Sequence, residues 1–362
     1  MPGTTLRFTI ISYESARFYF KYIRKYQLDA VVLDEVHKLK NPNSRQGNRI
    51  FRAIRSITYR IGLTGTDIEQ SVIDLFGQWR AINPNLLGEN FKIFRQEYCY
   101  RTGYMGYKLK IDKLNSRRVL ELLAPYTFKL EDKDVFGVTV LPPVYLYAEL
   151  KGTQKKLYQQ LERDMIAKYK DFKVKAPRTI TQMIRLQQIT GGHVPTEDKE
   201  MLKFECPKAE LLDEFLSTWS KKKKLVIFAR FIHELGLIEQ VCKKRGFSCY
   251  VYNHGEAHLD KKFQEEEHPQ ISISQITKGI ARTLTRGDTV VLFSWSHSHI
   301  VYRQCIGRVK SRGVFKKPIT PVLLMTKDTI DEDINNAVIK KQSESQFVAS
   351  FFNKLKERLT KS

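Results

Sequence analysis

The sequence lacks long apolar runs, and this absence excludes two classes of protein. No stretch approaches the roughly 20 apolar residues that a membrane-crossing helix needs. The first residues, Met1 to Thr5, do not form the apolar core of a secretion signal. We therefore expect a cytoplasmic protein (in the host cytoplasm if the chain is viral) that does not engage a membrane.

Cysteine is scarce and shows no pairing pattern. The five cysteines have no C-x-x-C spacing, and the eight histidines form no zinc-binding pattern beside them. An odd number of scattered cysteines predicts reduced thiols rather than a disulfide framework. The five are Cys99, Cys206, Cys242, Cys249 and Cys305.

Acidic residues are in deficit. The chain has 39 Asp and Glu against 62 Lys and Arg, which gives a formal net charge of +23. Such an excess favours binding to a polyanion, because neutralising phosphates releases their counterions. The alternative is that the charge only keeps the protein in solution, but negative charge serves that purpose better. The composition therefore predicts a nucleic-acid partner.

The most informative segment is an apolar run, Ala30 to Leu33, followed directly by Asp34 and Glu35. Such a run predicts a strand that is buried on both faces, as in a parallel sheet covered by helices. Ligands of such sheets bind at the carboxyl ends of the strands. One carboxylate there could hold Mg²⁺ while its neighbour orients or deprotonates a water molecule. The alternative is a buried strand that ends in a solvated acidic pair.

Two motifs decide between these readings. The segment Asp34–Asn41 (D-E-V-H-K-L-K-N) resembles the D-E-x-H-x-x-K-N motif of Swi/Snf-type members of helicase superfamily two. Leu63–Thr66 (L-T-G-T) resembles the L-T-G-T-P motif of the same family, in the same order and at a similar spacing. The resemblance implies an α/β fold of two RecA-like lobes with parallel sheets, ATP between the lobes, and double-stranded DNA as a partner.

The resemblance also implies roles for residues of the first lobe. Asp34 would bind Mg²⁺ through water, and Glu35 would be the general base for the attacking water. His37 would relay the state of the nucleotide to the segment that contains Thr64 and Thr66. ATP and Mg²⁺ are thus the implied cofactors.

A third motif lies in the expected second lobe. Gln304–Gly313 resembles Q-A-x-G-R-x-H-R-x-G. Gln304 would contact the nucleotide, and Arg308 would be an arginine finger that stabilises charge on the γ-phosphate. Ser311 stands where the second arginine should be, and Arg312, one place later, could substitute for it. The alternative for Arg308 is an ordinary surface residue of a helix.

Other parts of the family pattern are eroded. Asp67 and Gln70 replace a proline and an asparagine of the L-T-G-T-P motif, and Gln275–Ala281 keeps one glycine of a glycine-rich motif. Above all, no G-x-x-x-x-G-K-[ST] loop occurs, although such a loop normally cradles the phosphates. We therefore expect an N-terminally truncated first lobe with an unpaired sheet edge and an exposed apolar face.

The expected organisation has four parts. These are a partial first lobe (1–125), an inter-lobe helical region (126–205), a second lobe (206–345) and a C-terminal helical tail (346–362). Within them we expect a strand at Phe8–Glu14, a solvated charge run at Lys221–Lys224 and one long helix over Asp328–Leu359.

Three functions remain open at this level. The first is an ATP-dependent DNA translocase or helicase whose phosphate-binding loop comes from another polypeptide. The segment Ile184–Gly192 resembles the entry to the second lobe of this family, especially as it is written in phage-encoded relatives. The alternative is a non-hydrolysing DNA-binding or partner-binding remnant of such a motor. The third is a nuclease that uses Asp34 and Glu35, but the sequence has no second acidic cluster with metal-ligand spacing.

Overall fold

A computed structural model describes most of the chain. The described residues are 7–26, 28–65, 71–102, 108–130, 140–171, 176–196, 198, 200–252, 257–279, 282–310, 318–342 and 344–360. The chain divides into two compact units, Met1–Lys129 and Leu130–Ser362. Each unit is described by itself below.

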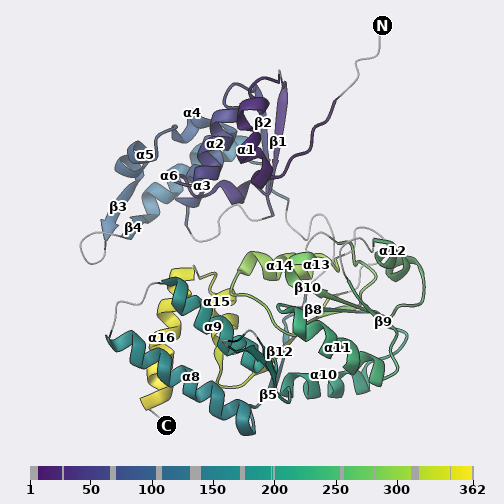
Figure 1. Ribbon diagram of the computed structural model, residues 1–362. Coiled ribbons are helices and arrows are strands. Elements are labelled where there is room, and N and C mark those ends of the chain that lie inside the picture. Colours follow the sequence, from purple (N-terminus) through teal and green to yellow (C-terminus); the bar gives the residue numbers. More distant parts are fainter. Residues whose placement is uncertain are drawn as a thin grey trace. The chain divides into compact units, whose positions relative to one another are not determined.

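The N-terminal unit combines a small parallel sheet with helices and a hairpin (Figure 1). The hairpin, β3 with β4, is antiparallel. The elements in chain order are α1 (Tyr13–Ile23), β1 (Ala30–Asp34), η1 (Val36–Leu39), α2 (Arg45–Ile54), β2 (Tyr59–Leu63), α3 (Asp74–Ile82), α4 (Pro84–Leu87), α5 (Phe91–Tyr98), β3 (Cys99–Thr102), β4 (Lys108–Ile111), α6 (Lys113–Leu123) and η3 (Ala124–Tyr126).

The predicted strand after Asp29 is confirmed, and it pairs in parallel with β2 in a register that sets Leu33 opposite Gly62. One face of this pair packs against helices, which Figure 1 shows gathered on one side of it. A Cβ on Gly62 would lie 2.5 Å from the Cδ1 atom of Ile82 in α3. Only glycine therefore allows α3 to approach β2 so closely.

The opposite face of the pair, which we call the bare face, is exposed. Its members Val32, Tyr59, Ile61 and Leu63 keep 56%, 66%, 52% and 49% of their surface accessible. The expectation that β1 is buried on both faces is therefore wrong for the described residues. The expectation of an exposed apolar face is confirmed. The physical reason is the same for both: helices cover only one side of the pair, and side chains alternate between the two faces.

The strand predicted at Phe8–Glu14 is also wrong. Residues 7–12 have no regular structure, and α1 begins at Tyr13. The Ser12 hydroxyl accepts a hydrogen bond from the backbone N–H of Ser15 at 3.1 Å and so caps the helix. The apolar side chains of Phe8 and Ile10 remain exposed, because no described strand pairs with this segment.

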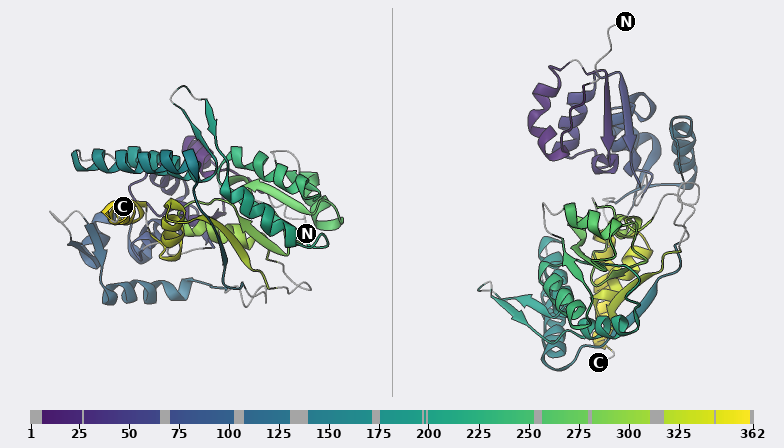
Figure 2. Two further views of the ribbon diagram at one scale, coloured as in Figure 1. Left: turned by 90° about the horizontal axis from the view of Figure 1, so that it is seen from below. Right: turned by 90° about the vertical axis from the view of Figure 1, so that its right-hand side faces the viewer.

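The C-terminal unit is built on a six-stranded parallel sheet of order β5-β12-β11-β8-β10-β9. A β6–β7 hairpin projects from this unit in both views of Figure 2. The elements in chain order are β5 (Val144–Ala148), α8 (Gly152–Asp171), α9 (Ala176–Thr190), β6 (His193–Pro195), β7 (Met201–Lys203), α10 (Pro207–Thr218), β8 (Leu225–Ala229), α11 (Ile232–Lys244), β9 (Cys249–Val251), α12 (Ala257–Glu265), β10 (Ile271–Gln275), α13 (Ile276–Gly279), β11 (Thr289–Leu292), α14 (His299–Gly307), β12 (Pro321–Thr326), α15 (Ile330–Ile339) and α16 (Glu344–Thr360).

Helices cover both faces of this sheet (Figure 1). On one face, Val226 and Phe228 of β8 belong to a core with α8, α9, α14, α15 and α16. On the other face, Leu225 and Ile227 belong to a core with α10 and α11. Every residue of β8, β11 and β12 is buried. The expected parallel sheet of the second lobe is confirmed.

Two further expectations for this unit need correction. The tail is two helices rather than one, and the chain turns between them at Lys341, whose φ of 49° lies in the left-handed region. Lys224 is buried rather than solvated, because its ammonium group donates hydrogen bonds to the carbonyls of Glu266 (2.6 Å) and Pro269 (3.1 Å).

Candidate nucleotide site

The sharp turn after β1 places the acidic pair at the carboxyl end of the strand. Asp34 closes the strand and is exposed on the bare face. Glu35 adopts left-handed backbone angles (φ 52°, ψ 51°), and η1 starts directly after it. A left-handed conformation costs a non-glycine residue about 1–3 kcal/mol. The fold accepts this cost, and the chain turns from β1 into η1 at Glu35.

His37 connects this turn to the second motif. Its Nδ1 atom lies 3.0 Å from the Thr64 hydroxyl oxygen and 3.1 Å from Oε2 of Glu35. The structure thus brings together Glu35, His37 and Thr64, which the sequence separates by up to 29 positions. Thr66 lies outside the described residues.

Burial and charge set the protonation of this cluster. Burial lowers the pKa of His37, although the charge of Glu35 opposes that shift. The imidazole is therefore neutral at pH 7. Burial also raises the pKa of Tyr13, and the charges of Asp34 and Glu35 raise it further. The Tyr13 hydroxyl stays protonated beside the acidic pair.

Tyr13 is a site residue that the sequence reasoning did not single out. Its buried hydroxyl has no hydrogen-bond partner among the described residues, and its ring lies 5.7 Å from the Lys38 ammonium. The signal was its place in the segment Phe8–Glu14. The expected strand at Phe8–Glu14 does not predict the approach of Tyr13 to the turn.

In the C-terminal unit, Gln304 and Arg308 lie one turn apart at the end of α14. Residues four apart share one side of a helix. Both side chains are half-buried. The Nε atom of Arg308 is buried and has no hydrogen-bond partner within the described part of the chain. Arg312 and Ser311 fall outside the described residues.

A second polar cluster occupies the carboxyl ends of β8, β10 and β11. Arg230 donates from Nη1 to the Gln187 side-chain oxygen at 2.6 Å, and its backbone N–H donates to the Ser294 hydroxyl at 2.7 Å. Gln275 donates to the Arg230 carbonyl at 3.0 Å. The sequence reasoning missed Arg230, although a polar residue directly after a buried strand is the usual signal.

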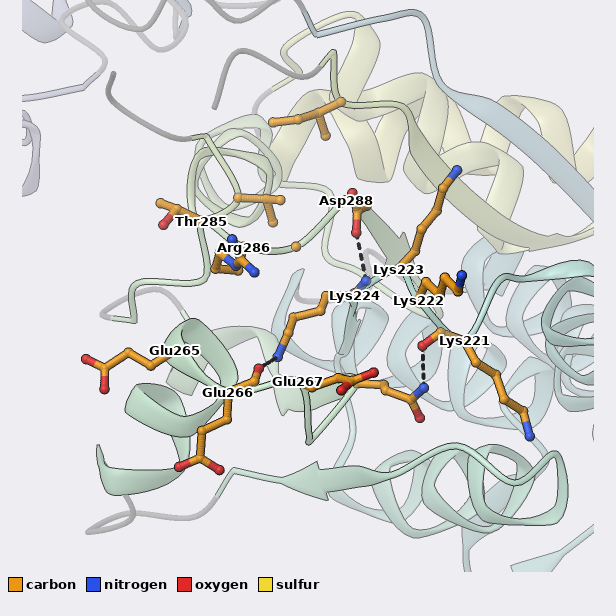
Figure 3. Close-up of a pocket in the computed structure, with 14 residues that line it drawn as sticks. Lys221, Lys222, Lys223, Lys224, Glu265, Glu266, Glu267, Thr285, Arg286 and Asp288 are labelled. Atoms are coloured by element: carbon orange, nitrogen blue, oxygen red, sulfur yellow. Dashed lines mark hydrogen bonds between the residues drawn. The ribbon is translucent and has the colours of Figure 1, made fainter. Parts of the chain in front are cut away.

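A pocket of about 350 Å³ lies at the opposite, amino-terminal edge of this sheet (Figure 3). Its lysines and Arg286 face an almost equal number of carboxylates, and Asp288 accepts a hydrogen bond from the backbone N–H of Lys224 at 2.7 Å. The near balance of charge and the structural role of Lys224 make it unsuited to a polyanion. The charged lining residues are Lys221–Lys224, Glu265–Glu267, Arg286 and Asp288.

The described residues hold no cluster of three or more His, Cys, Asp or Glu side chains arranged to bind a metal ion. Within the same part of the chain, no helix is both long and apolar enough to cross a membrane. All five cysteines are free thiols.

The model of the SNF2-related domain matches residues 3–192, more than half of the chain. The chain belongs to the SNF2-related domain family. Its lobes are accordingly RecA-like.

Relatives within the SNF2-related family support this membership. An uncharacterized ATP-dependent helicase of Mycoplasma pneumoniae is 23% identical over 343 residues, which cover 92% of this chain and 32% of the relative. The human SWI/SNF-related matrix-associated actin-dependent regulator of chromatin subfamily A member 1 is 23% identical over 350 residues, 90% of this chain and 32% of the relative. The chain thus spans about a third of the length of these curated relatives.

Among solved structures, the Sulfolobus solfataricus SWI2/SNF2 ATPase core in complex with dsDNA aligns with 93% of this chain and 71% of that chain. The TM-score is 0.43 and the identity 20%.

Proposed function

We propose that this SNF2-related chain is part of an ATP-dependent motor that moves on double-stranded DNA. In this proposal the phosphate-binding loop comes from a separate polypeptide. The observation that carries the proposal is the position of the His37 imidazole, which contacts both Glu35 and Thr64. The neutral imidazole lies between a carboxylate of the first motif and a hydroxyl of the second. A movement of one of these two segments would therefore be transmitted to the other.

In the proposed reaction, Glu35 accepts the proton of the attacking water, and His37 orients its carboxylate. Thr64 and Thr66 form the segment that responds when the contact with His37 changes. Tyr13, which stays protonated, serves as a hydrogen-bond donor beside the acidic pair.

The residues at the end of β1 fit Mg²⁺. Asp34 offers an exposed carboxylate at the carboxyl end of a parallel strand. Mg²⁺ prefers oxygen ligands, retains several waters and is commonly held by one or two carboxylates together with substrate phosphates. Asp34 would hold the ion through water, and the ion would neutralise charge on the phosphates of ATP.

In this proposal, Arg308 is the residue of the second lobe that stabilises the transition state of ATP hydrolysis. Its buried Nε atom lacks a partner in the described residues, which is expensive for a charged group unless a ligand satisfies it. Such an arginine stabilises the transition state of phosphoryl transfer by about 10³–10⁵ in rate in known systems. Gln304, on the same side of α14, and Arg312 would assist it.

The exposure of the bare face supports the proposal that an additional polypeptide packs against this sheet. Parallel strands are normally covered on both faces, yet Val32, Ile61 and Leu63 are about half exposed. An added strand and helix would cover these side chains. A loop between that strand and helix would reach the phosphates beside Asp34, because Asp34 lies on the same face.

The test combines the chain with a fragment that carries a strand, a G-x-x-x-x-G-K-[ST] loop and a helix. ATP hydrolysis should require the fragment and rise with duplex DNA. Glu35→Gln should abolish turnover and leave DNA binding unchanged, since it removes only the base. Glu121→Gln, in α6, is the matched control and should keep full activity.

A rate that stays at background with both the fragment and DNA present would contradict the motor. That result, together with intact DNA binding, would favour the second candidate, a non-hydrolysing DNA-binding or partner-binding remnant. The absence of a phosphate-binding loop from these 362 residues is the observation that favours this candidate.

A further inference from the structure

The segment 36–66 contains seven Lys and Arg residues and no Asp or Glu. Four of the seven are arginines of α2 or of the residue that ends it. They are Arg45, Arg49, Arg52 and Arg55. Surface helices usually mix charges of both signs, because pairs four residues apart stabilise the helix. An all-positive helix therefore forgoes that stabilisation.

These arginines form one side of α2, which we call the arginine face. The opposite side carries the buried residues of the helix, including Ile50, Phe51 and Ile54. Positions 45, 49 and 52 follow the spacing i, i+4, i+7, so they stack along one line. All four arginines are exposed. With a rise of 1.5 Å per residue, the face extends about 15 Å from Arg45 to Arg55.

Three members of the arginine face keep their charge unpaired with carboxylates among the described residues. No ion pair with a carboxylate joins Arg45, Arg52 or Arg55 in the described residues. The Arg49 guanidinium stacks over the ring of Phe20 in α1, 6.0 Å from its centroid. This contact fixes the position of Arg49 along the row.

The placement of Arg45 opposes helix stability. It is the first residue of α2, where the helix dipole is positive, and a cation there is unfavourable. Positive charge therefore accumulates at the positive end of the helix. An external anion that approaches this end would meet both the dipole and the arginines.

We propose that the arginine face of α2 binds the phosphate backbone of double-stranded DNA. Arginine binds phosphate oxygens through two parallel N–H groups, whereas lysine acts as a point charge. All four basic residues of the face are arginines. The inference rests on the proposed function, because it names the surface with which the motor grips DNA.

The experiment compares two variants of the full chain that lose the same net charge. The test variant carries Arg45→Gln, Arg52→Gln and Arg55→Gln. The control carries Arg117→Gln, Lys243→Gln and Lys261→Gln, three exposed cations that each pair with a glutamate four residues away. Glutamine is a good helix former, so both variants should keep their helices. Circular dichroism and thermal unfolding check this.

Duplex binding is measured by fluorescence anisotropy over a range of salt, without ATP or any fragment. Each lost phosphate contact lowers the slope of log K against log salt by about 1. The test variant should lower it by about 2–3 and weaken binding at every salt concentration. The control should change the slope by less than one contact.

Equal weakening in both variants would overturn the inference, because only the net charge would then matter. A test variant that loses affinity for single-stranded DNA alone would overturn it too. If the unaltered chain binds duplex DNA and the test variant binds it with the same affinity and salt dependence, the inference about the arginine face fails while the motor proposal stands. If the unaltered chain binds no duplex at low salt, both fail.

Discussion

The two parallel sheets of this protein contain similar strands in different surroundings. In the C-terminal sheet, Ile227 of β8 is fully buried against α10 and α11. In the N-terminal sheet, Ile61 of β2 is 52% exposed on the bare face. Both strands are apolar and both are paired in parallel. The comparison shows that strand formation follows from the local sequence, whereas burial depends on what packs against the strand.

The two units also differ in what they present to solvent. The C-terminal unit is held by its own core, including a charged network inside it. The N-terminal unit presents the acidic turn, the arginine face and an uncovered sheet. Three predictions test this contrast, from the largest effect to the smallest.

The largest effect should come from the buried network of the C-terminal unit. Lys208, fully buried, donates to Asp331 at 3.1 Å and to Thr190 at 3.2 Å. Lys208→Met would leave Asp331 buried without its cation, which typically costs 3–5 kcal/mol of unfolding free energy, so about that loss is expected. Urea denaturation measures it.

Lys243→Met is the matched control for Lys208→Met. Its ammonium group pairs with Glu239 on the surface of α11, so the unfolding free energy should stay unchanged. An equal loss in both variants would contradict the claim that the internal network stabilises this unit.

The second prediction compares the two sheets directly. Ile227→Ala should cost about 2–5 kcal/mol, because it leaves a cavity between the sheet and the helices α10 and α11. Ile61→Ala should cost about 0.5 kcal/mol or less, as at other exposed positions. Hydrogen exchange followed by mass spectrometry measures β8 and β2 separately. A large loss from Ile61→Ala in the isolated chain would show that the bare face is covered.

The third prediction concerns how the free energy of unfolding depends on pH. Burial raises the pKa of Glu234 to about 7, although Lys208 and the Ser294 hydroxyl favour its charged form. The native state therefore holds this proton more tightly than the unfolded state does, for which the pKa is near 4.5. The stability that protonated Glu234 contributes is complete below about pH 4.5 and is lost as the pH rises through about 7.

Glu234→Gln removes this titration. Between pH 5 and 7, the unfolding free energy of the variant should fall less steeply than that of the unaltered chain. Glu210→Gln, an exposed carboxylate of α10, is the control and should leave the slope unchanged. Parallel curves for the unaltered chain and Glu234→Gln would refute this role.

Much of the fold could be predicted from the sequence. The strands β1, β8, β11 and β12 follow from short apolar runs that contain β-branched residues, which favour strands wherever they pack. The end of α9 follows from Gly191 and Gly192, because Gly192 adopts a φ of +79°. The predictions that failed concern neighbours rather than local pattern. The segment before α1 has no partner strand, and the charge run before β8 contains a lysine that caps buried carbonyls.

The candidate site divides in the same way. The types and spacing of Asp34, Glu35, His37 and Thr64 were visible in the sequence, because the chemistry of a motif resides in the order of its residues. The sequence could not give the left-handed turn at Glu35, nor the approach of Tyr13, because both depend on how α1 and η1 pack beside the strand.

The sequence by itself determined the position of the apolar strands, the family and the positive charge of α2, since each depends on residues that are near one another in the chain. The tertiary structure alone decided which sheet face stays bare and that His37 reaches Thr64. Both outcomes depend on contacts between residues far apart in sequence, and those contacts exist only once the helices have packed.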